Sequence, residues 1–106
     1  QMKAKPMRSK GNGLFECPPE EAEYVWLNIP GLVGNCILPV IQSGPRKDKN
    51  CWTWNGSTDK PTLKPSVLTN ISPLVCHSYI TDGKIKFLED STHEFKGQTL
   101  DLLEVE

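Results

Sequence analysis

Proline and glycine recur along the whole chain and constrain its fold more than any other feature of the sequence. The 106 residues include 9 Pro and 8 Gly, and only 37% of them are hydrophobic. Pairs such as Pro18-Pro19 and Pro30-Gly31 interrupt regular structure, because proline lacks a backbone donor and both residues favour turns. We therefore predict a mainly β protein, a small single-domain sandwich or open barrel with at most one short helical turn.

Residues 75–88 are predicted to form a β-hairpin. Asp82-Gly83 suits a two-residue type I′ turn, in which both central residues need a positive φ. In the register that follows, one apolar side carries Cys76, Ser78, Ile80, Ile85 and Phe87. His77 lies on the opposite side, and Asp90 is diagonal to it just beyond the strand end.

Residues 1–12 are predicted to be a flexible basic tail, followed by one β-rich domain of residues 13–106. The tail carries four cations, Lys3, Lys5, Arg8 and Lys10. Further strands are expected at 13–17, 22–29, 36–41, 51–54 and 98–105. The helical turn is expected from Ser91, which has capping-box spacing to Glu94.

The charge and apolar pattern narrows the classes of partner. A net charge of −1 argues neither for nor against nucleic acid. No apolar run approaches the roughly 20 residues of a membrane span, and no signal peptide is recognised. We expect a cytoplasmic protein with no membrane partner.

Cysteine and histidine spacing gives no ready-made metal motif. None of the four cysteines forms a C-x-x-C pair. The hairpin and the turn after it nevertheless concentrate Cys76, His77, Asp90 and His93. An imidazole beside a carboxylate suits a metal ligand or a general base, and it is equally an ordinary Asp–His hydrogen bond at a strand end.

Two other candidate sites have weaker support in the sequence. A Ser–His–Asp set could be drawn from Ser66, His77 and Asp90. No G-x-S-x-G elbow surrounds Ser66, and Pro65-Ser66 is typical of a turn, so this reading is disfavoured. Trp52 and Trp54 could stack bases of single-stranded nucleic acid, although paired Trp on one strand face is more typical of a core.

An ordered set of short motifs resembles a small phage and bacterial family that is often labelled "ammonia monooxygenase". The motifs are W-T-W-N-G at 52–56, P-T-L-K-P-S at 61–66, C-H-S at 76–78, D-G-K-I at 82–85, D-S-T-H at 90–93 and G-Q-T at 97–99. Phe15 to Pro18 is similar to the N-terminal Cys motif of that family. The label itself has no visible chemical basis in these residues.

The resemblance implies a Cys/His metal site, most plausibly for zinc. The ligand set that it implies is Cys17, Cys76, His77 and His93. Glu20 and Ser91 stand where the family pattern has two further cysteines, which is what a partly lost structural site would look like.

These observations lead to two functional hypotheses. The first is a phage-type accessory protein, a macromolecule-binding module for host interaction with a structural or partly lost metal site. Its partner would be a protein rather than nucleic acid, in the host cytoplasm. The alternative is a zinc-dependent hydrolase that uses the cluster Cys76, His77, Asp90 and His93, with His77, Asp90 and His93 as the catalytic residues.

Overall fold

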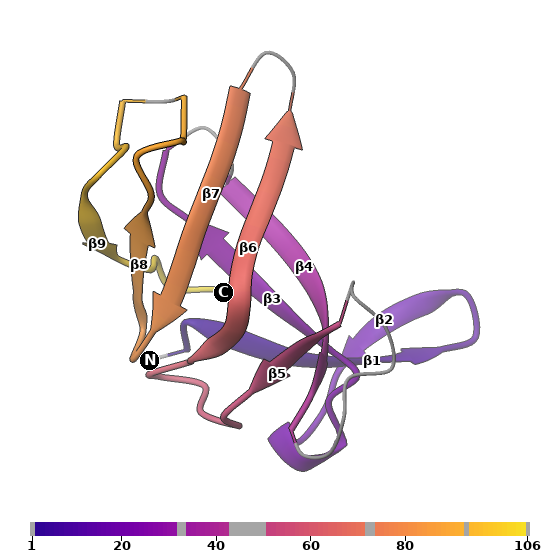
Figure 1. The fold of residues 1–106 in the computed structure, drawn as a ribbon. Coiled ribbons are helices and arrows are strands. Elements are labelled where there is room, and N and C mark those ends of the chain that lie inside the picture. The colour runs from indigo at the N-terminus through magenta and orange to yellow at the C-terminus, as the bar shows by residue number, and fades with distance from the viewer. Residues whose placement is uncertain (1, 32–33, 43–50, 72–73, 93, 106) are drawn as a thin grey trace.

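A single curled sheet of nine strands forms almost the whole molecule in the computed structural model (Figure 1). The structure describes residues 2–31, 34–42, 51–71, 74–92 and 94–105. The strands are β1 (Ala4–Lys10), β2 (Gly13–Glu16), β3 (Tyr24–Ile29), β4 (Gly34–Ile41), β5 (Trp52–Trp54), β6 (Leu63–Ile71), β7 (Leu74–Thr81), β8 (Lys84–Phe87) and β9 (Thr99–Asp101). Their order in the sheet is β2-β1-β3-β4-β5-β6-β7-β8-β9, antiparallel throughout except for the parallel pair β4–β5. The predicted open, barrel-like β fold is confirmed.

The curl of the sheet encloses the hydrophobic core on its inner face. Strand β3 shows why: Val25, Leu27 and Ile29 are buried, whereas the residues that alternate with them are only half-buried. Trp54, Phe87 and many aliphatic side chains from the other strands join the same cluster. The segment after β9 crosses back to the first half of the sheet, where Leu103 N–H donates to the Asn28 carbonyl. This return covers the core from the open side.

The hairpin of β7 and β8 has the predicted register. Asp82 and Gly83 both have positive φ, 51° and 78°, as a type I′ turn requires. The strand pairs include Ser78 with Phe87 and Ile80 with Ile85. All five residues predicted for the apolar side are buried, whereas Tyr79 on the other side is exposed.

The predicted flexible tail is instead a strand inside the sheet. β1 pairs with β2 on one side and with β3 on the other, and it buries Ala4, Pro6 and Met7. Two of its cations have partners: Lys5 Nζ lies 5.5 Å from the centroid of the Trp26 ring, and Arg8 forms an ion pair with Glu21 at 2.7 Å. The tail prediction failed because β1 is stabilised by pairing with strands distant in the sequence, and not by an apolar alternation of its own.

Helical structure among the described residues is limited to one 3₁₀ turn, Pro19–Glu21. The limit of one short helical turn is therefore confirmed, but the turn lies at Pro19–Glu21 and the helical turn expected from Ser91 is not found among the described residues there. No helix in the described part of the chain is long and apolar enough to span a membrane.

Candidate active site

An irregularity in β6 sets the position of Ser66. Leu63 pairs with Ile80 and Val67 pairs with Ser78, so four residue steps of β6 oppose two of β7. A bulge of this kind re-aims the side chains between the two pairs. Ser66 is half-buried within it, and its carbonyl accepts a hydrogen bond of 3.1 Å from Trp52 Nε1. The indole therefore fixes the backbone at the serine.

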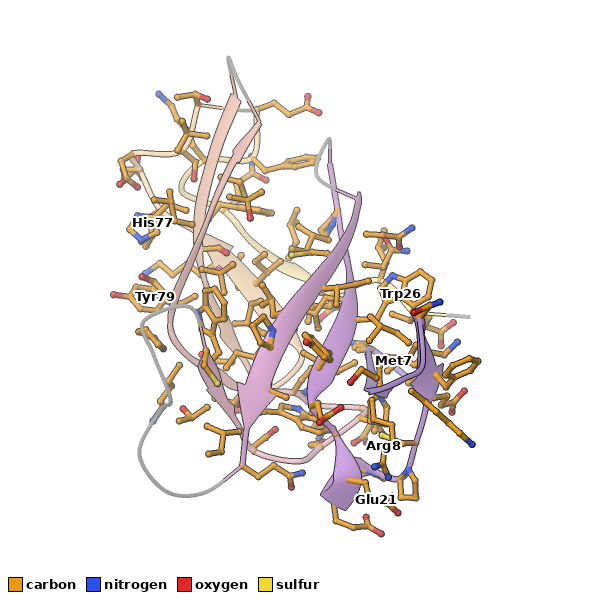
Figure 2. All side chains as sticks on the ribbon, turned by 90° about the vertical axis from the view of Figure 1, so that its right-hand side faces the viewer. Met7, Arg8, Glu21, Trp26, His77 and Tyr79 are labelled. Atoms are coloured by element: carbon orange, nitrogen blue, oxygen red, sulfur yellow. The ribbon has the colours of Figure 1, made fainter. Side chains whose placement is uncertain are left out.

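His77 lies on the neighbouring strand β7 and points to the outer face. The residues on either side of it, Cys76 and Ser78, face the core. Figure 2 shows His77 and Tyr79 directed away from the strands, on the same side of the sheet. The His77 side chain is 26% exposed, so its ring is accessible from solvent at one edge.

Asp90 lies in the turn after β8, and this turn places its carboxylate beside the His77 ring. Ser91, which is buried, binds the backbone of His77 through its hydroxyl: the oxygen accepts from His77 N–H and donates to the His77 carbonyl, both at 3.0 Å. The next residue adds a second attachment, because Thr92 N–H donates to the Val75 carbonyl and Thr92 Oγ1 accepts from Val75 N–H. These four bonds fix the turn against β7.

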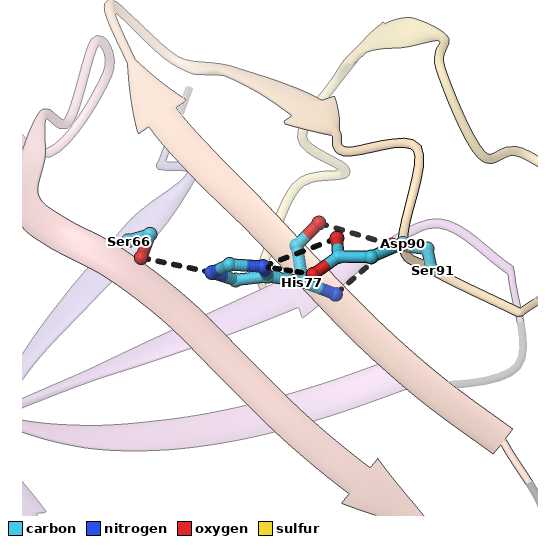
Figure 3. Close-up of polar contacts among 4 residues, drawn as sticks. All are labelled: Ser66, His77, Asp90 and Ser91. Carbon is cyan, nitrogen blue, oxygen red and sulfur yellow. Dashed lines mark hydrogen bonds and ion pairs between the residues drawn. The ribbon is translucent and has the colours of Figure 1, made fainter.

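Ser66, His77 and Asp90 form one hydrogen-bonded chain on the outer face of the sheet (Figure 3). His77 Nε2 is 3.0 Å from Ser66 Oγ, while His77 Nδ1 is 2.9 Å from Asp90 Oδ2 and 3.1 Å from Oδ1. This is the relation of nucleophile, base and orienting carboxylate that serine hydrolases share across unrelated folds. The set that the sequence disfavoured is the one that the fold assembles.

Sequence reasoning named Ser66 but disfavoured it, because no strand-to-helix elbow surrounds this residue. Here the serine lies within strand β6, where Pro65-Ser66 had indicated a turn. The signal that could have found it is pairing: Leu68 lies opposite His77, so the residue two positions before Leu68 is diagonal to the histidine on the same face.

The three described residues of the predicted metal set, Cys17, Cys76 and His77, do not lie together. Cys76 faces the core whereas His77 faces outward, and Cys17 lies near the start of the sheet, where its N–H bonds the Pro6 carbonyl. His93 lies outside the described residues. Among the described residues no group of three or more His, Cys, Asp or Glu side chains could hold a metal ion. The prediction from the resemblance that this is a zinc-binding protein is therefore not supported by the described residues.

Cys17, Cys36 and Cys76 have the character of structural thiols rather than nucleophiles. Burial raises the pKa of the Cys36 thiol, and burial together with Cys36 raises the pKa of Cys76 to about 11. Burial, followed by the nearby Glu21 carboxylate, also raises the pKa of Cys17. A thiol with a raised pKa is poorly reactive because the thiolate is the attacking species.

The raised pKa of Cys76 predicts a loss of stability in alkali. The pKa of the thiol is ordinarily about 9.0, as in the unfolded chain, whereas burial raises it to about 11 in the folded protein. The unfolded state is therefore favoured increasingly as the pH rises from 9 to 11, by roughly 2 kcal/mol at pH 10.5. Urea denaturation of the wild type and of Cys76→Ala at several pH values measures this, and the variant should show a smaller alkaline decline. Equal declines would contradict the assignment to Cys76.

Ser91 should act as a positioning residue for the histidine and the aspartate. Replacing it with Ala removes both bonds to the His77 backbone and leaves a buried N–H without its partner. We expect kcat to fall roughly ten- to hundredfold with a smaller change in KM, because the turn that carries Asp90 is no longer fixed. Steady-state kinetics at several pH values measures the effect. A rise in KM alone, with kcat intact, would contradict a positioning role.

The two Trp residues proposed as a nucleobase platform are engaged within the protein. Trp54 is 1% exposed, and its Nε1 donates to the Ser57 carbonyl at 3.0 Å. Trp52 packs partly against the core and donates to Ser66. The core interpretation that the sequence favoured agrees with this placement.

Comparison with known proteins agrees with the geometry of the triad. A family model described as "Bacterial ubiquitination-like system serine protease (BubE)" matches residues 4–88, a range that contains Ser66 and His77 and ends two residues before Asp90. No curated protein and no solved structure matches the chain.

The family match overturns two expectations from the sequence. The resemblance to the family labelled "ammonia monooxygenase" is wrong as an identification, and so is the phage-type host-binding module, because the matching family is a bacterial protease family. The hydrolase alternative was closer, although it invoked zinc. Since the match spans most of the chain, this protein belongs to the BubE family of serine proteases of bacterial ubiquitination-like systems.

Proposed function

We propose that this protein is a serine protease that cleaves a peptide or isopeptide bond of a ubiquitin-like modifier or its conjugates. The observation that carries the proposal is the hydrogen-bonded chain from Asp90 through His77 to Ser66. The family name supplies the substrate class, since it describes proteases of a bacterial ubiquitination-like system. The four free thiols fit a reducing compartment, so the proposal places the enzyme in the cytoplasm.

The geometry suits acyl transfer in two steps. Ser66 Oγ attacks the scissile carbonyl carbon while His77 Nε2 accepts the hydroxyl proton. The tetrahedral intermediate collapses as the C–N bond breaks, and the imidazolium gives its proton to the leaving amine. Water then attacks the acyl-serine with His77 again as the base, which releases the carboxylate and restores the serine.

Asp90 holds the ring of His77 in the orientation that this sequence needs. By accepting from Nδ1–H it leaves Nε2 as the acceptor that faces Ser66. The carboxylate is 66% exposed, so water screens its charge and its effect is mainly on ring orientation and tautomer. Loss of Asp90 should therefore cost less activity than loss of either other member of the set.

Labelling with a fluorophosphonate tests the proposed nucleophile directly. Attack by Ser66 Oγ displaces fluoride from phosphorus and leaves a stable phosphonyl ester, with His77 accepting the proton. We expect one adduct per molecule, mapped to Ser66 by mass spectrometry of the digested protein, and much slower labelling of His77→Ala. An adduct on another residue, or no adduct on folded protein, would rule out Ser66 as the activated serine.

A ubiquitin-like protein from the same bacterial system, carrying a short C-terminal extension, tests the substrate class. The wild type should release the extension, and protein labelled at Ser66 should not. Labelling at Ser66 without cleavage of this substrate would retain the serine hydrolase but reject the modifier as its substrate.

A further inference from the structure

The backbone N–H of Val67, the residue after the proposed nucleophile, is the first group to consider as an oxyanion donor. Acyl transfer to a serine needs hydrogen-bond donors for the negative charge that develops on the scissile carbonyl oxygen. In an elbow motif, the residue that follows the nucleophile supplies one of them. Val67 instead lies within β6, so the direction of its N–H is set by the pairing with β7.

The hydrogen bonds of β7 show that the Val67 N–H is engaged within the sheet. The His77 carbonyl accepts from Leu88 N–H and His77 N–H donates to the Ser91 hydroxyl, so both backbone groups of His77 point toward β8. Hydrogen-bonded and non-hydrogen-bonded pairs alternate along antiparallel strands, so the next residue, Ser78, turns its N–H and C=O toward β6. Ser78 pairs with Val67. The Val67 N–H therefore donates to β7 and is not directed at a substrate.

Side-chain donors on the β5 side of the serine are engaged or lie elsewhere. Trp52 Nε1 donates to the Ser66 carbonyl at 3.1 Å, and Thr53 Oγ1 donates to the Lys64 carbonyl at 3.3 Å. The Lys64 side chain lines a cavity together with Thr53 and Asn55, on the side of β6 that is away from His77. A side-chain donor for the oxyanion is therefore to be sought on the β7 side of Ser66.

Tyr79 lies across from the proposed nucleophile on β7. The residues before and after it pair with Val67 and Leu63, so Tyr79 faces the irregular stretch of β6 that contains Ser66. Side chains opposed in this way on one face have Cβ atoms about 5 Å apart. The phenol ring is therefore a direct neighbour of the serine.

The Tyr79 side chain also lies on the same outer face as the triad. It follows His77 by two residues on β7, and Figure 2 shows both side chains directed away from the strands on one side of the sheet. Tyr79 is 50% exposed, so its ring extends beyond the sheet beside the space that a bound carbonyl must occupy. Tyrosine hydroxyls are among the side-chain donors that stabilise developing oxyanions in enzymes.

We propose that the Tyr79 hydroxyl donates a hydrogen bond to the oxyanion of the tetrahedral intermediate. As Ser66 Oγ bonds the carbonyl carbon, the π electrons of the C=O bond move to its oxygen and the serine proton passes to His77 Nε2. Tyr79 donates to that oxygen and keeps its own proton, and the charge is lost again when the C=O bond re-forms. This inference rests on the proposed function and adds a catalytic residue to the same site. The hydroxyl therefore acts in the transition state more than in substrate binding.

The Tyr79→Phe variant tests the hydroxyl while keeping the ring. We expect kcat to fall about hundredfold with KM changed by less than about threefold. Steady-state kinetics uses both p-nitrophenyl acetate and the extended ubiquitin-like substrate, because the small ester has no peptide that could contact the ring. The matched control is Tyr24→Phe, the other of the two tyrosines in the chain, which lies on β3 and should keep kcat within about twofold.

Methylboronic acid gives a second measurement that does not depend on turnover. Its boron atom bonds Ser66 Oγ while the serine proton passes to His77, which leaves a tetrahedral, negatively charged boronate that resembles the intermediate. Its affinity is read from the protection of Ser66 against fluorophosphonate labelling. The affinity should fall by at least about tenfold in Tyr79→Phe, because analogues of the transition state lose the interactions that the transition state makes.

The outcomes separate this inference from the proposed function. A kcat within about tenfold of the wild type in Tyr79→Phe, or an unchanged affinity for methylboronic acid, would overturn the role of the hydroxyl. A rise in KM alone, or a loss confined to the protein substrate, would make Tyr79 a substrate contact and would overturn it too. In each of these cases the proposed function stands. If the wild type shows no Ser66-dependent hydrolysis, the proposed function fails together with the inference.

Discussion

Replacing Ser66 with Ala is expected to reduce kcat roughly 10⁴-fold or more, because the substrate loses the nucleophile that forms the acyl intermediate. The fold should be unaffected. The backbone carbonyl that binds Trp52 remains, and the hydroxyl that is lost was half-buried and directed to the outer face. Hydrolysis of p-nitrophenyl acetate and of the extended ubiquitin-like substrate, both followed over time, measures the loss.

The matched control for this prediction is Ser9→Ala. The Ser9 hydroxyl likewise has a side-chain partner, because it donates to the Glu23 carboxylate at 3.0 Å, but it lies on β1. Its loss should leave kcat within about twofold, as is usual for an exposed position away from special features. Retention of a tenth or more of the activity in Ser66→Ala would show that another group performs the attack.

Replacing Trp54 with Ala is expected to lower the free energy of unfolding by about 3–5 kcal/mol, the range for large aromatic residues lost from a core. Trp54 is 1% exposed and heads the set of large, fully buried side chains. Its Nε1 bond to the Ser57 carbonyl is lost as well, which leaves that acceptor without the indole. Urea denaturation followed by far-ultraviolet circular dichroism measures the change.

The exposed Phe15 provides the control for the Trp54 prediction. This ring is 54% exposed on β2, at one end of the sheet order. Phe15→Ala removes an aromatic ring of comparable chemistry from the surface, and it should change the free energy of unfolding by about 0.5 kcal/mol or less. A Trp54→Ala variant as stable as Phe15→Ala would mean that the curl of the sheet does not depend on this side chain.

The site also differs from the arrangement that serine hydrolase motifs describe. In an elbow motif the serine lies on a tight turn between a strand and a helix. Here Ser66 lies in an irregular stretch of β6, and the histidine comes from the strand paired with it. The nucleophile, the base and the orienting carboxylate are recognised by the distances among their side chains and not by a local sequence motif. The sequence alone therefore disfavoured this triad.

Local sequence determined the β class and the hairpin of β7 and β8. Turn chemistry at Asp82-Gly83 and the two-residue alternation act over a few residues, so they predict the register and the buried side directly. The same register already placed Asp90 diagonal to His77, and that part of the site could be read without a structure.

Two features were decided by the tertiary structure alone: the position of β1 within the sheet, and the placement of Ser66 beside His77. The basic residues of β1 give no apolar pattern, and the strand is stable because β2 and β3 satisfy its backbone on both sides. Ser66 meets His77 only because β6 pairs with β7 through a two-residue irregularity, which no short sequence window specifies. Pairing between strands is a non-local interaction. It depends on how the side chains of the whole core pack together, and the few residues that meet in the site do not specify it.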